Sequence, residues 1–325
     1  MKKIDYNGKK LETVSKMKKC FLLFAEIIFF IQLFQMNASA KESDLESFFE
    51  NSSKERLPQT IVGRVVTDFL QKPLPEGKVE KKVIVMGFDG FREDGLENIL
   101  EDSSSSIRMV ANEGGLYHTY AGGEKNFVQE TTTGPGWASI LSGEWSNVTG
   151  VKTCADTKQD GVNTFLMEAA KKGIPSSFVA SWKEHFSVTY KNDILHVDQY
   201  NLPLQFVQTD NDEETYEWVL NQVSKREGTK TYEKQEADVI FFTLEVTDAI
   251  GHQTGYGNEN PAYRDACFIA DTCGRNILWE IQNRDTYEQE DWLILITTDH
   301  GGVGTTHGGQ TEQEKYTWMA CNHKL

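Results

Sequence analysis

The segment Val83-Ile84-Val85-Met86-Gly87-Phe88 decides the fold of this chain. Its uninterrupted apolar run is typical of a short strand covered on both faces, because a half-exposed strand would alternate apolar and polar residues. Residues 239–246 and 292–298 repeat the pattern. Three such strands, separated by helical segments, predict an α/β fold with a mostly parallel central sheet and helices on both faces.

Each of these apolar segments is followed closely by an aspartate: Asp89, Asp248 and Asp299. A single aspartate after a strand is more often a turn former or a helix cap than a ligand. The carboxyl ends of parallel strands, however, meet at one edge of the sheet, and open α/β sheets bind their ligands at that edge. The sequence therefore predicts that the three carboxylates lie close together.

Histidines accompany two of these aspartates. His252 lies four residues after Asp248, His300 follows Asp299 directly, and His307 belongs to the same glycine-rich loop. A lone Asp–His pair is more often a hydrogen-bonded pair than a metal site. A mixed set of carboxylates and imidazoles favours Zn²⁺ or another borderline divalent ion over Mg²⁺ or Ca²⁺. We therefore expect a metal centre.

A threonine-rich segment precedes an apolar helix in the middle of the chain. Trp137, Ile140 and Leu141 have helical spacing, and Thr133 is expected at the N-cap. Taken alone, Thr133 is more often an ordinary cap than a catalytic group. The N-terminus of a helix also attracts anions such as phosphate. Beside the acids and histidines, we expect the Thr133 hydroxyl to belong to the site.

The remaining segments fit the same fold. Helices are expected at residues 164–172 and after Asn211, and strands at residues 177–181 and 316–321. Residues 184–208 show no clear period, and we interpret them as an insertion at the rim of the site.

The N-terminus predicts export. Lysines precede the apolar residues 20–34, and Ala38-Ser39-Ala40 provides small residues for cleavage. We predict a signal peptide at residues 1–40, a polar lead-in segment at 41–80 and one large domain at 81–325. The mature protein would then be secreted or extracytoplasmic, without a stable membrane span. The alternative is an uncleaved N-terminal segment that anchors the protein in a membrane.

The charge of the chain restricts its partners. The net charge is −16, and loss of residues 1–40 removes seven lysines and three acidic residues. The mature chain carries about −20, which repels nucleic acid and anionic membranes. No nucleic-acid-binding surface is expected, and an anionic substrate would require bound cations. The sequence carries no signal of an oligomeric state.

Four cysteines follow the predicted signal peptide. Cys267 and Cys273 are expected to share one helix, where six residues rise about 9 Å, too far for a disulfide. Pairing of either with Cys154 or Cys321 stays open, because secretion permits disulfides. No CxxC spacing indicates a cysteine zinc site.

The order and spacing of these motifs resemble the alkaline phosphatase superfamily, most closely its type I phosphodiesterase/nucleotide pyrophosphatase branch. The resemblance covers roughly residues 82–307 and implies an alkaline-phosphatase-like fold with two zinc ions. By this resemblance, one ion would be held by Asp248, His252 and His307. The other would be held by Asp89, Asp299, His300 and the hydroxyl of Thr133.

The resemblance also implies a function. The domain at residues 81–325 would be a secreted two-metal hydrolase of phosphodiester or pyrophosphate bonds in small, nucleotide-like phosphate esters, with Thr133 forming a phospho-threonine intermediate. Gly136 stands where the branch usually has an asparagine that holds a phosphoryl oxygen, and Gly134 replaces an aromatic residue. Arg92 or Lys183 is a candidate substitute for that asparagine. The alternatives are a phosphomonoesterase of the same superfamily and a catalytically inactive secreted binding protein on this scaffold.

Overall fold

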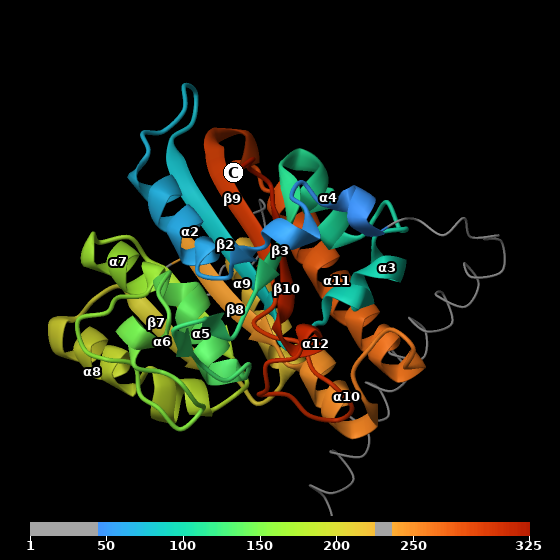
Figure 1. Ribbon diagram of the computed structural model, residues 1–325. Coiled ribbons are helices and arrows are strands. Elements are labelled where there is room, and N and C mark those ends of the chain that lie inside the picture. Colours follow the sequence, from blue (N-terminus) through green and yellow to red (C-terminus); the bar gives the residue numbers. More distant parts are fainter. Residues whose placement is uncertain (1–44, 225–235) are drawn as a thin grey trace, which may run out of the picture. The chain divides into compact units, whose positions relative to one another are not determined.

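A computed structural model describes residues 45–224 and 236–325 (Figure 1). The predicted signal peptide at residues 1–40 lies outside the described residues. The described part of the chain contains an eight-stranded sheet with strand order β1-β3-β10-β9-β2-β8-β6-β7. These strands are β1 (Leu57–Pro58), β2 (Glu80–Phe88), β3 (Gly115–Tyr120), β6 (Ser176–Ala180), β7 (Leu204–Gln208), β8 (Val239–Leu244), β9 (Glu290–Thr297) and β10 (Tyr316–Cys321).

The three predicted apolar strands are neighbours in the centre of the sheet. β2 pairs in parallel with β8 as far as Phe88↔Leu244 and with β9 as far as Gly87↔Thr297. Their carboxyl ends therefore stop at the same edge. β10 is antiparallel to β3 and β9, so the sheet is mixed but mostly parallel, and the predicted fold class is confirmed.

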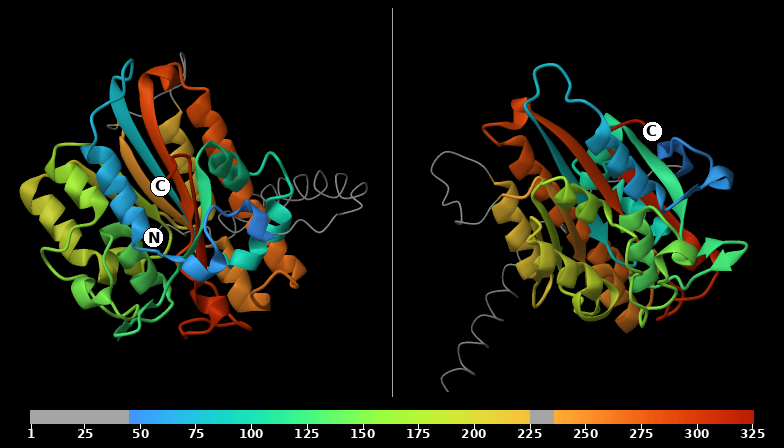
Figure 2. Two further views of the ribbon diagram at one scale, coloured as in Figure 1. Left: turned by 45° about the horizontal axis from the view of Figure 1, so that its top comes forward. Right: turned by 90° about the vertical axis from the view of Figure 1, so that its left-hand side faces the viewer.

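Helices cover both faces of the sheet (Figure 2). Alternate residues of β2 point to opposite sides, with Ile84 and Met86 in one core and Val83 and Val85 in the other. The first core is closed by α3 (Leu96–Ile99), α4 (Ser106–Glu113), α9 (Asp212–Val223) and α11 (Pro261–Gln282). The second is closed by α2 (Ile61–Gln71), α5 (Thr133–Ser142), α7 (Phe165–Lys171) and α8 (Lys191–Tyr200).

Short elements complete the described chain. They are β4 (Gly123–Glu124), β5 (Phe127–Val128), α6 (Ser146–Thr149), α10 (Val246–Thr254) and α12 (Glu312–Lys315), the 3₁₀ turns η2 (Leu45–Phe48), η3 (Ser53–Glu55), η4 (Glu93–Gly95) and η6 (Tyr287–Gln289), and the π-helix η5 (His185–Thr189).

The helix after the threonines begins one residue earlier than predicted. Thr132, not Thr133, is the N-cap: its backbone is extended, and its carbonyl accepts the first helical bond from the Gly136 N–H at 2.9 Å. Pro135 lies within the first turn, where an absent N–H costs nothing because those donors have no intrahelical partner. Thr133 is therefore the first helical residue of α5.

β8 is shorter than the predicted strand. It stops at Leu244, and α10 begins at Val246. The Asp212 carboxylate causes this change, because it accepts hydrogen bonds from the backbone N–H groups of Glu245 at 2.9 Å and Val246 at 2.8 Å. Asp248 consequently lies in the first turn of a helix and His252 one turn later.

Residues 184–208 are more regular than the predicted rim insertion. They form η5, α8 and β7, and all five residues of β7 pair in parallel with β6. This pairing extends the sheet at its edge, so the segment has a regular structure that its sequence did not indicate, and its place at the rim of the site stays a prediction.

Among the described residues, no disulfide forms. Cys154, Cys267, Cys273 and Cys321 are free thiols. Cys267 and Cys273 share α11, as predicted. Within residues 45–224 and 236–325, no helix has both the length and the apolar character needed to cross a membrane.

Candidate metal centre

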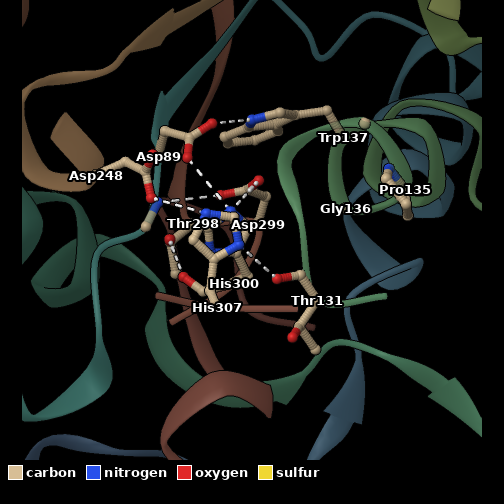
Figure 3. A network of polar contacts seen from close by, with 12 residues as sticks. Asp89, Thr131, Pro135, Gly136, Trp137, Asp248, Thr298, Asp299, His300 and His307 are labelled. Atoms are coloured by element: carbon tan, nitrogen blue, oxygen red, sulfur yellow. Dashed lines mark hydrogen bonds and ion pairs between the residues drawn. The ribbon is translucent and has the colours of Figure 1, made fainter. Parts of the chain in front are cut away.

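Three carboxylates meet at the carboxyl edge of the sheet (Figure 3). Asp89 directly follows β2, Asp299 lies just after β9, and Asp248 extends from the first turn of α10. The side chains of Asp89 and Asp299 are fully buried, and that of Asp248 is 14 % exposed. The parallel register of the central strands therefore brings together carboxylates from distant parts of the sequence, as expected.

The three histidines present the same ring atom to the site. Each Nδ1 lies against a backbone carbonyl: that of His252 at 3.0 Å from Thr305 O, that of His300 at 2.8 Å from Gly301 O, and that of His307 at 3.0 Å from Thr131 O. A carbonyl can only accept, so Nδ1 carries the proton and donates. Nε2 of each ring is thereby directed to the carboxylates, the arrangement that second partners impose on metal-binding histidines.

Asp248, His252 and His307 form one group. His252 Nε2 lies 3.3 Å from Asp248 Oδ2 and 3.0 Å from His307 Nε2, and His307 Nε2 lies 3.5 Å from Asp248 Oδ1. The hydrogen bond to Asp248 raises the pKa of His252 to about 9. Without a cation, His252 therefore holds a proton between itself and Asp248, and metal binding must displace that proton.

Asp89, Asp299 and His300 form the second group. His300 Nε2 lies 3.4 Å from Asp89 Oδ1 and 3.4 Å from Asp299 Oδ2. These three atoms are buried and have no hydrogen-bond partner. Burial, and then the charge of neighbouring carboxylates, raises the pKa of Asp89, and burial likewise raises that of Asp299. Burial also lowers the pKa of His300 to about 3, so His300 cannot neutralise them.

The two groups are contiguous and fit divalent cations. Ligand atoms of Asp89, Asp299 and His300 lie within 4.8 Å of one another, and so do those of Asp248, His300 and His307. His300 is thus within reach of both groups, whereas the resemblance assigned it to one. Unpaired buried carboxylate oxygens are costly without a counter-charge. Nitrogen and oxygen donors of this kind are those that Zn²⁺ prefers.

Thr133 lies between residues that touch both groups. The residue is 6 % exposed at the start of α5. In the next turn of α5, a Cβ built on Gly136 would lie only 2.8 Å from Asp299 Cβ, and Trp137 Nε1 donates to Asp89 Oδ2 at 2.9 Å. Before the helix, the Thr131 carbonyl accepts from His307 (Figure 3). The structure therefore brings α5 and the segment before it to the predicted carboxylates and histidines, with Thr133 between the contacting residues along the chain.

Residues 83–320 match the type I phosphodiesterase / nucleotide pyrophosphatase family. This chain belongs to that family. The resemblance to this family that the sequence motifs predicted is therefore confirmed. A search of curated proteins gives no match.

Two solved sulfatase structures share the fold of this family member, and a third structure is similar to part of it. A putative sulfatase from Bacteroides thetaiotaomicron has a TM-score of 0.52 and 11 % identity, over 75 % of this chain and 64 % of that chain. A 2-O GAG sulfatase has a TM-score of 0.50 and 11 % identity, over the same shares of 75 % and 64 %. Murine ectonucleotide pyrophosphatase / phosphodiesterase 5 has a TM-score of 0.45 and 16 % identity, over 69 % and 58 %. This chain thus spans less than two thirds of each of these chains, and the likeness to the two sulfatases, at 11 % identity, is one of fold.

Two aromatic residues of the site escaped the sequence analysis. Trp137 was expected only as an apolar helix residue, although its position one turn after Thr133 places both on one face of α5. Tyr256, whose hydroxyl donates to Asp248 Oδ1 at 2.5 Å, carries no signal in the sequence. Of the two candidate phosphate-binding cations, Arg92 is paired with Asp94 at 2.7 Å and donates to the Gly302 carbonyl at 3.3 Å, and the Lys183 side chain is 72 % exposed.

Proposed function

We propose that this chain is a secreted hydrolase of phosphoric esters that uses two divalent cations, Zn²⁺, and acts on phosphodiester or pyrophosphate bonds of small, nucleotide-like substrates. One observation carries the proposal: unpaired carboxylate oxygens and an imidazole nitrogen converge, buried, beside the helix that begins at Thr133. Membership of the type I phosphodiesterase / nucleotide pyrophosphatase family supports the reaction class.

The seven predicted site residues would divide between the ions as the resemblance implies. One set is Asp248, His252 and His307; the other is Asp89, Asp299, His300 and the Thr133 hydroxyl. When bound, the cations supply the positive charge that a threonine alkoxide and the phosphoryl oxygens require. The negative net charge of the protein repels an anionic substrate. The cations would overcome this repulsion, because they attract the substrate at contact distance.

Thr133 Oγ1 would be the nucleophile. It forms a bond to phosphorus while the bond from phosphorus to the ester oxygen breaks, and its proton passes to solvent. The departing oxygen takes a proton from solvent, and water then cleaves the phospho-threonine. A free N–H group at the start of α5 would hold a phosphoryl oxygen. Thr133 supplies it, since the Gly134 N–H donates to Cys154 Sγ at 3.4 Å, Pro135 has no N–H and that of Gly136 is bonded to Thr132.

A comparison of substrates tests this proposal. We expect bis(4-nitrophenyl) phosphate and a nucleoside-monophosphate nitrophenyl ester to be cleaved faster than 4-nitrophenyl phosphate by the zinc-loaded protein. The absence of a side chain at Gly136 favours the alternative phosphomonoesterase, which would reverse that order. An inactive binding protein would cleave none of the three and would contain less than one ion per chain.

Secretion is the remaining part of the proposal. It rests on residues 1–40, so the test is export of a reporter fused behind them and N-terminal sequencing of the product. We expect a mature chain that begins at Lys41. A product that retains the apolar segment in the membrane fraction would support the anchored alternative.

A further inference from the structure

Tyr256 is not one of the predicted metal ligands, but it forms a hydrogen bond to one of them, Asp248. Its side chain is almost fully buried, and its hydroxyl donates to Asp248 Oδ1. The other carboxylate oxygen, Oδ2, faces His252 Nε2 at 3.3 Å. The phenol therefore fixes the rotation of the carboxylate while one oxygen remains directed at the imidazole.

The ring of Tyr256 is itself held between the two segments that carry this group. A Cβ on Gly251, in α10, would lie 2.4 Å from the ring, and a Cβ on Gly302, in the loop after β9, would lie 2.6 Å from it. The ring also packs edge-on against the imidazoles of His252 and His307, with centroids 5.7 Å and 6.1 Å away. Only glycine leaves room for this close packing at both positions.

Asp89, in the second group, depends on a different donor. Trp137 Nε1 donates to its Oδ2 at 2.9 Å, and the ring of Trp137 is fully buried in α5 (Figure 3). The carboxylates of the two groups are therefore oriented by separate aromatic residues from separate elements. Loss of one donor leaves the other in place.

We infer that Tyr256 is a positioning residue for the cation held by Asp248, His252 and His307, and that it acts on this cation and not on the one held by Asp89, Asp299 and His300. The inference rests on the proposed two-metal function. Loss of a partner that orients a metal ligand lowers metal affinity by about 10- to 100-fold. Among the carboxylates of residues 45–224 and 236–325, the phenol hydroxyl donates to that of Asp248 alone, so the loss should fall on one ion.

The experiment is a Zn²⁺ titration of the full chain after dialysis against a chelator, comparing wild type, Tyr256→Phe and Tyr216→Phe. Tyr216→Phe is the matched control: it removes the same hydroxyl from a partly buried tyrosine that accepts from Asn276 at 3.0 Å on α11. We expect two ions in wild type and in the control. In Tyr256→Phe we expect one ion with unchanged affinity and a second that binds about 10- to 100-fold more weakly.

Other outcomes separate the two proposals. Two ions bound to Tyr256→Phe with wild-type affinities, or an equal loss of both, would overturn the role of Tyr256 and leave the hydrolase intact. Less than one ion in wild type would overturn the hydrolase itself. Gly302→Ala provides a second variant, because it keeps the hydroxyl but displaces the ring, and it should weaken the same single ion. An unchanged titration of Gly302→Ala would also count against the inference.

Discussion

Gly136 gives the sharpest test of how α5 meets the buried carboxylates. In Gly136→Ala, the new Cβ would lie 2.8 Å from Asp299 Cβ, 3.0 Å from the Asp299 carbonyl oxygen and 3.1 Å from Oδ2. Carbon atoms pack favourably at about 3.5–4.0 Å, so the helix or Asp299 must move by about 0.7 Å or more. A shift of Asp299 would displace its Oδ2, the unpaired atom that faces His300.

The magnitude follows from two opposing effects. Overpacking in a core costs about 1–3 kcal/mol, whereas alanine in place of glycine within a helix gains about 1 kcal/mol. The free energy of unfolding of the metal-free protein should therefore fall by up to about 2 kcal/mol, or about 4–8 °C in melting temperature for a domain of this size. Displacement of Asp299 should weaken one Zn²⁺ by about 10- to 100-fold.

Gly134→Ala is the matched control in the same helix. Its Cβ would meet Cys154 Cα at 3.1 Å and Sγ at 3.5 Å, without contact to Asp299. Only a few tenths of an ångström of adjustment is needed there, so both zinc affinities should stay at the wild-type level. The assay is a Zn²⁺ titration with thermal melting of both metal-free variants. If Gly136→Ala bound both ions as tightly as Gly134→Ala and melted at the same temperature, the close approach of α5 to Asp299 would be refuted.

Three further predictions follow from the site and the core. Thr133→Ala should abolish hydrolysis while both ions stay bound, because six protein ligands remain; activity within about tenfold of wild type would remove Thr133 as the nucleophile. A chelator should abolish hydrolysis and lower the melting temperature, and Zn²⁺ should restore both. The free energy of unfolding should fall by about 2.7 kcal/mol if the free metal had been at a hundred times its dissociation constant. Unchanged hydrolysis and melting after chelation would contradict the metal centre. Burial lowers the pKa of His185 to about 3, and both ring nitrogens lack partners. The unfolded chain thus binds more protons between about pH 6.5 and 3, so stability should fall as the pH drops through this window, by up to about 1.4 kcal/mol per pH unit from this residue. His185→Phe should show a shallower loss in urea unfolding between pH 7 and 5, and parallel curves for the two proteins would exclude this cause.

Much of the fold was predictable because it depends on local patterns. Continuous apolar runs marked β2, β8 and β9, since strands buried on both faces leave no polar position. The same runs placed Asp89 and Asp299 at one edge. The end of β8 was not predictable, because it is set by Asp212, a residue from another helix whose carboxylate caps α10.

The candidate site, like the fold, was predictable from the sequence only in part. The sequence named the acids, the histidines and Thr133 from their types and spacing, and their role as ligands stays a prediction. How these residues group around each ion was harder to predict from the sequence. His300 faces Asp89 and Asp299 and also lies within reach of Asp248 and His307. Such sharing depends on how the loop after β9 packs against α10 and against the segment before α5, which spacing along the chain does not encode.

What the sequence alone determined is therefore which residues carry the chemistry and which strand ends present them, because hydrophobic periodicity and strand termination are local properties. What only the tertiary structure decided is how those residues are held. The Trp137–Asp89 hydrogen bond and the contact between Gly136 and Asp299 join elements that meet only after the sheet has formed. The Tyr256–Asp248 hydrogen bond spans only eight residues, but the ring of Tyr256 packs against Gly302 in the distant loop after β9. Contacts of this kind are set by strand register and helix packing, which follow from the burial of the whole core rather than from any one segment.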